Sequence, residues 1–392
     1  MLFTGRSIES GDVITVSVAN GRMTDVATGI CGPAFGGDDV WIAPGFHDLQ
    51  INGFGGHDFN RNAWSPGDAP DYAAIYKSLA AHGTALFCPT IVTAPTSIML
   101  DNLRYLACEL ERSPELRKSV TGIHLEGPFL SPEEGPRGAH PSEDLKLPDL
   151  DLWHRFQDAA QGNIRMVTIA PELPGALPLI ERVVEEGAVA AIGHTSARSE
   201  AIRDAVSAGA TVSTHLGNGC HACLPRHSSY LWEQLASDAL TATLIADGHH
   251  LDPAALRVFV RAKGPARVAL VSDAVSLAGM PAGRYGRFTV EEDGTIRLSG
   301  TPYLGGASRL LDAAIPNAVA WTDMELREAV GAVTVTPAKV LKLPGKGRLA
   351  PGNDADLTLF RYQSRREAGL RPEPLQIVAC VAGGSVLYQL QS

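Results

Sequence analysis

The chain has 392 residues, 45% of them hydrophobic and 19% charged, and its formal net charge is −10. This length suits one large folded domain with a smaller companion. The acidic balance argues against nucleic acid and anionic membranes as partners, because both are negatively charged. No apolar run reaches the ~18 residues of a membrane span. The expected partner is therefore a small-molecule substrate.

The N-terminus and the cysteines indicate the compartment. The first residues, MLFTGRSIESGD, include acidic and polar side chains and have no apolar core of a secretory signal. The six cysteines are scattered along a long chain, which favours reduced thiols over a disulfide framework. We expect a cytoplasmic protein. Cys220 and Cys223 form a single CxxC pair without a second pair, so they only weakly indicate a structural zinc site.

The first 43 residues predict a small β unit. Residues 12–19 are rich in β-forming side chains, and Asn20-Gly21 is typical of a hairpin turn. Residues 40–42 then lead into Pro44-Gly45. This segment is too short to enclose much of a core by itself, so it needs a partner segment.

From residue 45 onward, apolar runs alternate with helical patterns. The eight runs predict strands at 45–51, 84–92, 120–125, 164–169, 188–192, 211–214, 240–246 and 268–271. Helices are expected between them at 71–82, 95–111, 150–160, 175–186, 199–208, 228–237 and 253–262. Asp252-Pro253 is typical of a helix start and Gly209 of a helix end.

This alternation predicts the fold class. Eight strands alternating with helices over roughly 300 residues are the count of a (β/α)8 TIM-type barrel. The alternative is a doubly wound open sheet, which usually has fewer strands and often carries a GxGxxG turn after an early strand. Such a turn does not follow an early strand in this sequence.

The last third of the chain departs from the alternation. Residues 280–305 predict a hairpin excursion around Asp293-Gly294, and helices follow at 307–321 and 324–332. From residue 344 the pattern is β-like again, at 347–349, 356–361, 377–381 and 385–390. We expect residues 1–43 and 344–392 to pair in a small discontinuous β-sandwich domain beside a catalytic barrel at 44–343.

Polar residues stand where the predicted strands end. Glu126 follows the third strand, His194 and His215 follow the fifth and sixth, and Asp273 follows the eighth. Strands joined by a right-handed helical crossover are parallel, and neighbours lie roughly 4.8 Å apart. Since the active sites of such barrels lie at the carboxyl ends of the strands, we expect these four side chains to meet.

The expected chemistry follows from these residue types. Two neutral imidazoles and one carboxylate are a common ligand set for a catalytic Zn²⁺, with the fourth position left to water. A metal of this kind lowers the pKa of its water toward ~7. Asp273 could take a proton and return it to the leaving group. The plainer interpretation treats each histidine as a polar strand end and Asp273 as a cap after the last strand. His124 could lie behind the metal or be a buried core residue.

Several short segments resemble a known superfamily. They are PGFHDLQING at 44–53, HLEGP at 124–128, GHT at 193–195, THL at 214–216, ADGHH at 246–250 and SDA at 272–274. Together they resemble the amidohydrolase superfamily, and within it the amino-sugar phosphate deacetylases, over nearly the whole chain. The resemblance implies removal of acetate from N-acetyl-D-glucosamine 6-phosphate, giving D-glucosamine 6-phosphate.

The resemblance also implies roles for individual residues. The metal ligands are Glu126, His194 and His215, and Asp273 is the general base and acid. His140 polarises the acetyl carbonyl together with the metal. Asn218, the backbone of Gly219 and His250 contact the substrate. Arg226 crosses the interface of a homodimer and contacts the phosphate of the substrate bound by the other subunit.

Two positions bear on the metal count. The wider superfamily ends its first strand in His-x-His, which holds a second metal, and this chain has Gln50 and Asn52 there. Amides are poor Zn²⁺ ligands beside imidazole. We therefore expect one tightly bound divalent metal ion per chain, Zn²⁺ before others, and expect the two amides to contribute to substrate binding.

One segment leaves the identity of the substrate undecided. The family usually has Leu-x-Asn-Ala-Met after the sixth-strand histidine, whereas this chain has LGNGCHACLPRH at 216–227. Another N-acetyl sugar or sugar phosphate, or another cyclic or linear amide, is therefore an alternative substrate. A non-catalytic metal-binding scaffold is a further alternative, but it would have no use for Asp273.

Overall fold

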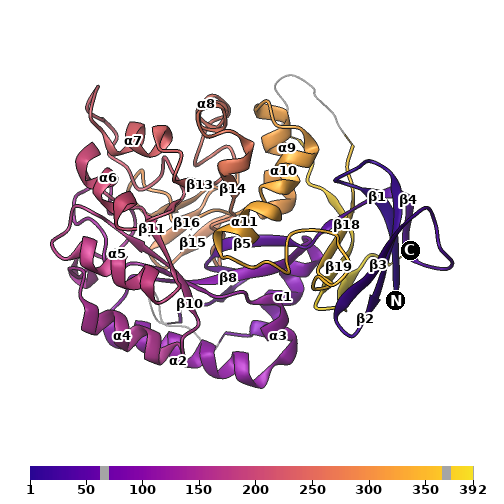
Figure 1. The fold of residues 1–392 in the computed structure, drawn as a ribbon. Coiled ribbons are helices and arrows are strands. Elements are labelled where there is room, and N and C mark those ends of the chain that lie inside the picture. The colour runs from indigo at the N-terminus through magenta and orange to yellow at the C-terminus, as the bar shows by residue number, and fades with distance from the viewer. Residues whose placement is uncertain (62–69, 364–371, 392) are drawn as a thin grey trace.

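The computed structural model describes residues 1–61, 70–363 and 372–391. It consists of a helix-covered barrel and a smaller β-sheet packed against one side of it (Figure 1). Every side chain proposed above for the site lies within the described residues. Of the predicted C-terminal segment 344–392, residues 364–371 and 392 lie outside them.

The barrel sheet confirms the predicted alternation. Its eight strands are parallel to their neighbours and occur in the order β14-β13-β12-β11-β10-β9-β8-β5. Their bounds are β5 (Phe46–Ile51), β8 (Thr84–Val92), β9 (Ile123–Glu126), β10 (Ile164–Ile169), β11 (Val189–Ile192), β12 (Val212–Ser213), β13 (Thr241–Leu244) and β14 (Val268–Leu270).

The two ends of this sheet meet just beyond the last strand. Ile51 and Ala274 form a parallel bridge. The Asp273 N–H donates to the Gln50 carbonyl at 2.9 Å, and the Asn52 N–H donates to the Ala274 carbonyl at 2.8 Å. The sheet therefore closes as a (β/α)8 barrel, as predicted, and the carboxyl end of its first strand lies against that of its last.

Helices cover the outside of the barrel (Figure 1). Those at predicted positions are α1 (Tyr72–Ala81), α2 (Thr96–Arg112), α4 (Leu150–Ala159), α5 (Ala176–Glu185), α6 (Ser199–Ser207), α7 (Tyr230–Ala236), α8 (Pro253–Lys263), α9 (Leu311–Trp321) and α10 (Leu326–Gly331). The sequence reasoning missed two short helices, α3 (Pro114–Ser119) and α11 (Val335–Val340). In α11 three β-branched residues and a proline weaken the helical pattern.

The helix caps and the hairpin turn that the sequence predicted are present in the structure. The Asp252 carboxylate caps α8 by accepting the Ala255 N–H at 2.8 Å, with Pro253 in the first turn. Gly209 follows α6 with a φ of +109°. Asn20 and Gly21 have φ values of +52° and +75°, the left-handed pair that a tight hairpin turn needs.

The two chain ends pair in a second sheet. Its order is β20-β19-β18-β4-β1-β2-β3, and β4 (Phe35–Pro44) joins the N-terminal strands to β18 (Leu357–Arg361). The remaining strands are β1 (Leu2–Ser7), β2 (Val13–Ala19), β3 (Arg22–Thr28), β19 (Gln376–Ala382) and β20 (Ser385–Gln389).

This sheet refines the expected β-sandwich. All seven strands are hydrogen-bonded into one sheet rather than two. Val16 of β2 and Val381 of β19 nevertheless share one hydrophobic core, so the sheet curls over itself. Residues 347–349, expected as a strand, form a turn instead. Gly347 has a φ of +78° there, and a Cβ on it would lie 2.8 Å from the Thr334 carbonyl oxygen.

Smaller elements lie near the open end of the barrel. Antiparallel strands β15 (Gly283–Tyr285), β16 (Phe288–Val290) and β17 (Ile296–Leu298) form the predicted excursion. The pair β6 (Gly53–Phe54) and β7 (His57–Asp58) follows the first barrel strand. The short 3-10 turn η1 (Ser142–Asp144) lies in the loop after β9, whereas the turn η2 (Pro265–Arg267) lies at the opposite end of the barrel, directly before β14.

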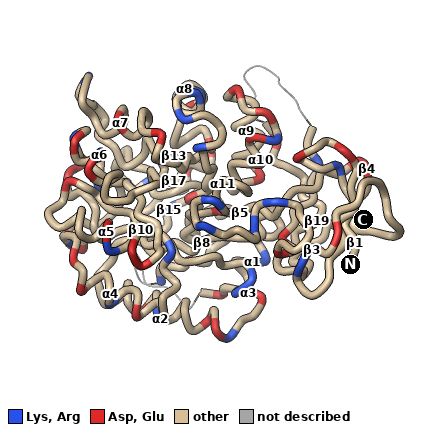
Figure 2. Tube along the Cα trace, viewed as in Figure 1, with Lys and Arg blue, Asp and Glu red and all other residues tan. Residues whose placement is uncertain are grey.

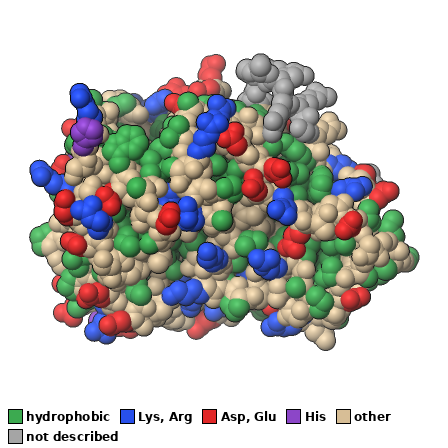
Figure 3. Space-filling view, turned by 45° about the horizontal axis from the view of Figure 1, so that its top comes forward, with side chains coloured by type: hydrophobic (Ala, Val, Ile, Leu, Met, Phe, Trp, Pro, Cys, Tyr) green, Lys and Arg blue, Asp and Glu red, His purple; other side chains and the backbone are tan. Residues whose placement is uncertain are grey.

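Charged side chains are distributed over the outside. Acidic and basic residues alternate along the helices and loops in Figure 2. On the face drawn in Figure 3 they are scattered among hydrophobic and neutral side chains. Within the described ranges, every helix is too short or too polar to span a membrane.

The sheet and the barrel share a buried aromatic contact. The rings of Phe46 in β5 and Phe360 in β18 lie 5.6 Å apart, and both side chains are fully buried. We predict that Phe360→Ala lowers the free energy of unfolding by about 3–5 kcal/mol, because it leaves a cavity between the two units. Urea denaturation measures this change.

The matched control for Phe360→Ala is Trp232→Ala, which removes an aromatic ring that is 51% exposed. Its expected effect is within about 0.5 kcal/mol of zero, as for most surface substitutions. An equal loss of unfolding free energy in the two variants would contradict the role of Phe360 in joining the sheet to the barrel.

Candidate active site

A cavity of about 270 Å³ opens where the barrel strands end. Its walls include all four residues that the sequence placed at strand ends, Glu126, His194, His215 and Asp273. These side chains are almost entirely buried from solvent. The barrel topology therefore brings them together, since the carboxyl ends of its strands meet at one face.

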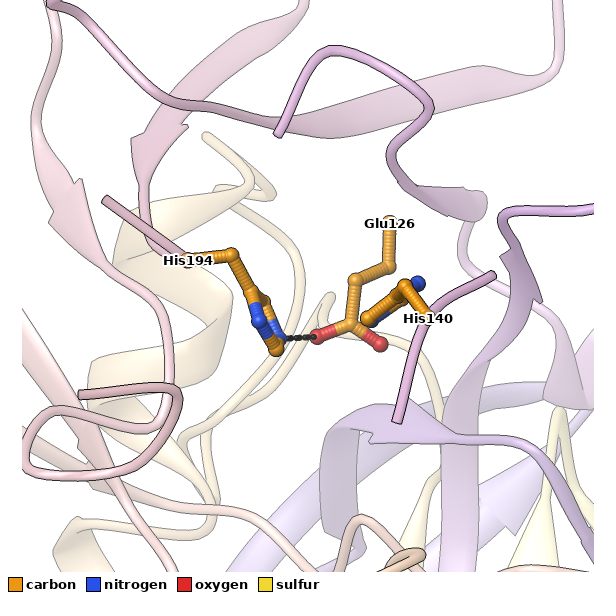
Figure 4. Close-up of side chains that lie close together, drawn as sticks. All are labelled: Glu126, His140 and His194. Carbon is orange, nitrogen blue, oxygen red and sulfur yellow. Dashed lines mark ion pairs between the residues drawn. The ribbon is translucent and has the colours of Figure 1, made fainter. Parts of the chain in front are cut away.

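Glu126 and the two strand-end histidines form a compact cluster. Glu126 Oε1 lies 2.8 Å from His215 Nε2 and 3.3 Å from His194 Nε2, and the two Nε2 atoms are 3.1 Å apart. Figure 4 shows the His194 ring with its nitrogen directed at the Glu126 carboxylate.

The outer partner of His194 determines its tautomer. Nδ1 lies 2.8 Å from the Pro136 carbonyl oxygen, which can only accept, so Nδ1 carries the hydrogen. In the neutral ring Nε2 then presents a lone pair toward Glu126. Glu126 Oε1 and the two Nε2 atoms thus converge in a buried position, and buried groups of this kind require a positive charge as a partner. A divalent metal fits this arrangement.

His140 adds a fourth candidate ligand. Its ring packs edge-on against His194 with centroids 4.5 Å apart. Ligand atoms of Glu126, His140 and His194 all lie within 4.8 Å of one another, and all three residues are buried. In Figure 4, His140 and His194 lie on either side of the Glu126 carboxylate. The site could thus offer either His215 or His140 as its second imidazole.

Burial and the neighbouring charges shift the pKa values of this cluster. Burial raises the pKa of Glu126, but the neighbouring His194 and His215 rings outweigh it and hold that pKa well below its usual range. Burial, together with the nearby His194, lowers the pKa of His140 to about 3. Glu126 is therefore a carboxylate and His140 a neutral imidazole at neutral pH.

Asp273 is held by the two amides of the first strand. Its Oδ1 accepts the side-chain N–H of Asn52 at 2.7 Å and that of Gln50 at 3.2 Å. Gln50 also donates to Glu126 Oε1 at 2.9 Å, so it bridges the two carboxylates. Burial and the charge of Glu126 raise the pKa of Asp273 to about 6. Both amides were expected to contact substrate. In the structure both contact carboxylates, and of the two Asn52 lines the cavity, so substrate contact stays a prediction.

Three of the four strand-end residues have strained backbones. The φ angles are +51° at His194, +28° at His215 and +49° at Asp273, in the left-handed region that non-glycine residues rarely adopt. Such conformations persist where surrounding contacts enforce them, and they gather at functional sites. The strain is consistent with a role for these residues in chemistry.

The cavity wall also includes three of the residues expected to contact substrate. Asn218, Gly219 and His250 all line it. His250 Nδ1 lies 2.7 Å from Asp247 Oδ2, which orients its ring. A Cβ at Gly219 would lie 2.7 Å from His194 Nδ1, so glycine lets this loop pass close to the metal-facing ring. Arg226 is exposed and lies outside the cavity lining.

Sequence reasoning missed one wall of the cavity. Residues 302–306, which follow β17, line it together with Val275. The Tyr303 hydroxyl donates to Glu134 Oε1 at 2.9 Å, which joins this wall to the loop that carries His140. The glycines at 305 and 306 were the only local signal, and they do not reveal a long-range contact.

Two other histidines lie within barrel strands, away from the cavity lining. His124 is buried below the cluster, with Nε2 2.8 Å from the Thr168 hydroxyl, and burial lowers its pKa to about 4. His47 is buried near the start of β5, with Nε2 2.7 Å from the Thr121 hydroxyl. Neither one lines the cavity.

The CxxC pair gains no support as a zinc site. Cys220 lines the cavity, Cys223 is exposed, and both are free thiols. Within the part of the chain that the structure describes, the groups that could hold a metal are built on Glu126 and His194, with His140 or His215, and include neither cysteine.

The comparisons with known proteins agree with the geometry. A model of the amidohydrolase family matches residues 41–380. The chain belongs to the amidohydrolase family.

Its relatives within this family are deacetylases. It is 37% identical over 336 residues to N-acetylglucosamine-6-phosphate deacetylase of Homo sapiens, covering 81% of this chain and 79% of the human protein. It is 32% identical over 327 residues to N-acetylgalactosamine-6-phosphate deacetylase of Escherichia coli O157:H7, covering 82% of this chain and 83% of that protein.

A solved structure gives a similar result. It is a mutant N-acetyl-D-glucosamine-6-phosphate deacetylase from Mycobacterium smegmatis in complex with N-acetyl-D-glucosamine-6-phosphate. It superposes with a TM-score of 0.84 at 31% identity, covering 99% of both chains.

The cluster of Glu126, His194 and His215 predicts that a bound metal ion stabilises the folded protein. A ligand present at 100 times its Kd stabilises the native state by about 2.7 kcal/mol. We expect Zn²⁺ to raise the Tm of the metal-free protein and His194→Ala to abolish most of that increase. Differential scanning calorimetry with and without Zn²⁺ measures both.

His154→Ala is the matched control for His194→Ala, because His154 pairs with Glu186 on the exposed surface of α4. It should respond to Zn²⁺ like the unmodified protein. An undiminished Zn²⁺ response in His194→Ala would argue against a metal centre at this cluster.

Proposed function

We propose that this chain hydrolyses the N-acetyl group of N-acetyl-D-glucosamine 6-phosphate, giving D-glucosamine 6-phosphate and acetate, with one divalent metal ion per chain. The observation that carries the proposal is the convergence of Glu126, His194 and His215 in one cavity with Asp273 facing them. Membership of the amidohydrolase family supports amide hydrolysis at such a site.

We assign the metal to Glu126, His194 and His215, with Zn²⁺ as the preferred ion. Nitrogen and oxygen donors at this spacing suit Zn²⁺, and the amides at Gln50 and Asn52 argue against a second tight site. When bound, the metal supplies Lewis-acid polarisation and lowers the pKa of a water molecule.

Asp273 moves the proton. Since its Oδ1 accepts both amide N–H groups, Oδ2 is the oxygen left for proton transfer. A pKa near 6 leaves Asp273 mostly ionised at neutral pH yet able to hold a proton briefly. It takes a proton from the attacking water and delivers it to the amide nitrogen as the C–N bond breaks. The products are acetate and the free amine.

His140 acts on the carbonyl oxygen. It lines the cavity beside the metal cluster and is a neutral imidazole. A neutral ring can donate one N–H to the oxygen on which negative charge develops. Its loop is anchored by the Arg137 side chain, which donates to the His140 carbonyl at 2.9 Å.

Asn218, Gly219 and His250 bind the sugar phosphate. All three line the cavity, and an imidazole and an amide side chain are suitable phosphate and hydroxyl partners. The galactosamine-type relative makes N-acetyl-D-galactosamine 6-phosphate the second candidate, and the unusual loop at 216–227 favours testing it.

Arg226 suits a role in a homodimer. Its side chain is exposed on the loop after β12 and cannot act as a wall of its own cavity. We propose that it reaches the phosphate bound by a second copy of the chain. We also propose a cytoplasmic location, which exposed free thiols at Cys31 and Cys223 favour.

Substitution of Asp273 tests the reaction chemistry. We predict that Asp273→Asn lowers kcat by about 10²–10⁴-fold, because the amide can neither accept nor return the proton. Steady-state assays of acetate release measure the change. The control is Asp312→Asn, another buried carboxylate, which pairs with His82 away from the cavity. Near-normal turnover in Asp273→Asn would refute the assignment.

Substitution of Arg226 tests the phosphate and the dimer together. Loss of a charged hydrogen bond is worth about 1.5–3 kcal/mol, so Arg226→Ala should raise KM for N-acetylglucosamine 6-phosphate roughly 10–100-fold. KM for unphosphorylated N-acetylglucosamine should not change. Arg261→Ala, an exposed arginine paired with Asp323, is the control. Equal KM changes for both sugars would contradict the phosphate contact.

A further inference from the structure

The turn that follows β11 is held by a carboxylate outside the cavity. Glu172 lies in the loop after β10 and does not line the cavity, so it cannot touch substrate there. Its Oε2 accepts the Thr195 hydroxyl at 2.5 Å, and its Oε1 accepts the Ser196 N–H at 2.7 Å. These are the two residues directly after His194.

The same turn is held from its other side. The Ser131 N–H donates to the His194 carbonyl at 2.9 Å. The Ser196 hydroxyl lies 2.9 Å from Glu133 Oε1 and 3.1 Å from Glu172 Oε1. The Thr195 hydroxyl in turn accepts the Ala197 N–H at 3.0 Å. The turn after His194 is therefore tied to the neighbouring loops on both of its sides.

His194 needs such support because of its backbone. Its φ of +51° is unfavourable for a side chain with a Cβ, and contacts must enforce it. The preceding Gly193 is already confined, since a Cβ there would lie 2.7 Å from Thr214 Cβ. The backbone after His194 is the part that could still relax, and Glu172 holds that part.

From this we infer that Glu172 is a positioning residue for metal binding. It maintains the left-handed turn at His194 and so keeps Nε2 directed at Glu126, without contacting metal or substrate. The inference rests on the proposed metal centre. The alternative is that Glu172 merely stabilises the approach to α6, which begins at Ser199.

A Zn²⁺ affinity measurement separates these two roles. The protein is stripped with a chelator, and its Kd for Zn²⁺ is measured by competition with a chromophoric chelator. Glu172→Gln keeps the shape of the side chain, but it replaces one carboxylate oxygen, which accepts hydrogen bonds, with an amide NH₂ group, which donates them. Partners beyond the ligands typically affect metal affinity 10–100-fold, so we expect Kd to rise by about that factor. The Tm of the metal-free protein should change little.

Two further variants complete the test. Glu186→Gln is the matched control, because Glu186 also accepts two side-chain hydrogen bonds, from Trp153 and His154, but far from the cavity. Its Zn²⁺ affinity should equal that of the unmodified protein. Thr195→Val removes one bond to Glu172 and should raise Kd by a smaller factor. It decides the question if Glu172→Gln does not fold.

The outcomes are distinguishable. Unchanged Zn²⁺ affinity in Glu172→Gln and Thr195→Val, with a lowered Tm of the metal-free form, overturns the positioning role and leaves the proposed function intact. Absence of Zn²⁺ binding by the unmodified protein instead contradicts the proposed metal centre.

Discussion

Closure of the barrel is the constraint on which the site depends. The first strand meets the segment after the last strand through two backbone hydrogen bonds, from Asp273 to Gln50 and from Asn52 to Ala274. These bonds set Asp273 between the two amide side chains of the first strand. The strands between them then bring Glu126, His194 and His215 to the same rim. The site is thus a property of the closed sheet, and it would not form in an open one.

The carboxylates of Glu126 and Asp273 share this small cavity, and their pKa values are shifted in opposite directions. The histidines hold the pKa of Glu126 low, whereas burial and the charge of Glu126 raise that of Asp273 to about 6. Gln50 donates to both, which reduces the repulsion between them. Environments that push two pKa values apart commonly mark different chemical roles, here a ligand and a proton carrier.

Local sequence signals predicted the repeating parts of this molecule well. The run at 84–92 and the Asp252-Pro253 start gave a strand and a helix at those positions because the physics there is local. Glu126, His194, His215 and Asp273 could be placed because each lies at the carboxyl end of its strand or within three residues of it. Glu172 and Tyr303 could not be found, since their partners lie in other loops and no spacing reveals them. His140 required resemblance, because it lies in a loop without periodicity.

The second sheet has a consequence for how the chain is made. Strand β4 pairs with β18, and Phe46 is covered by Phe360, some three hundred residues later. During synthesis the N-terminal strands therefore have an open edge, and the first barrel strand has an uncovered aromatic ring, until the last tenth of the chain emerges. Unpaired edges invite association with other chains. The nascent protein must remain in this vulnerable state while the residues between β4 and β18 are translated.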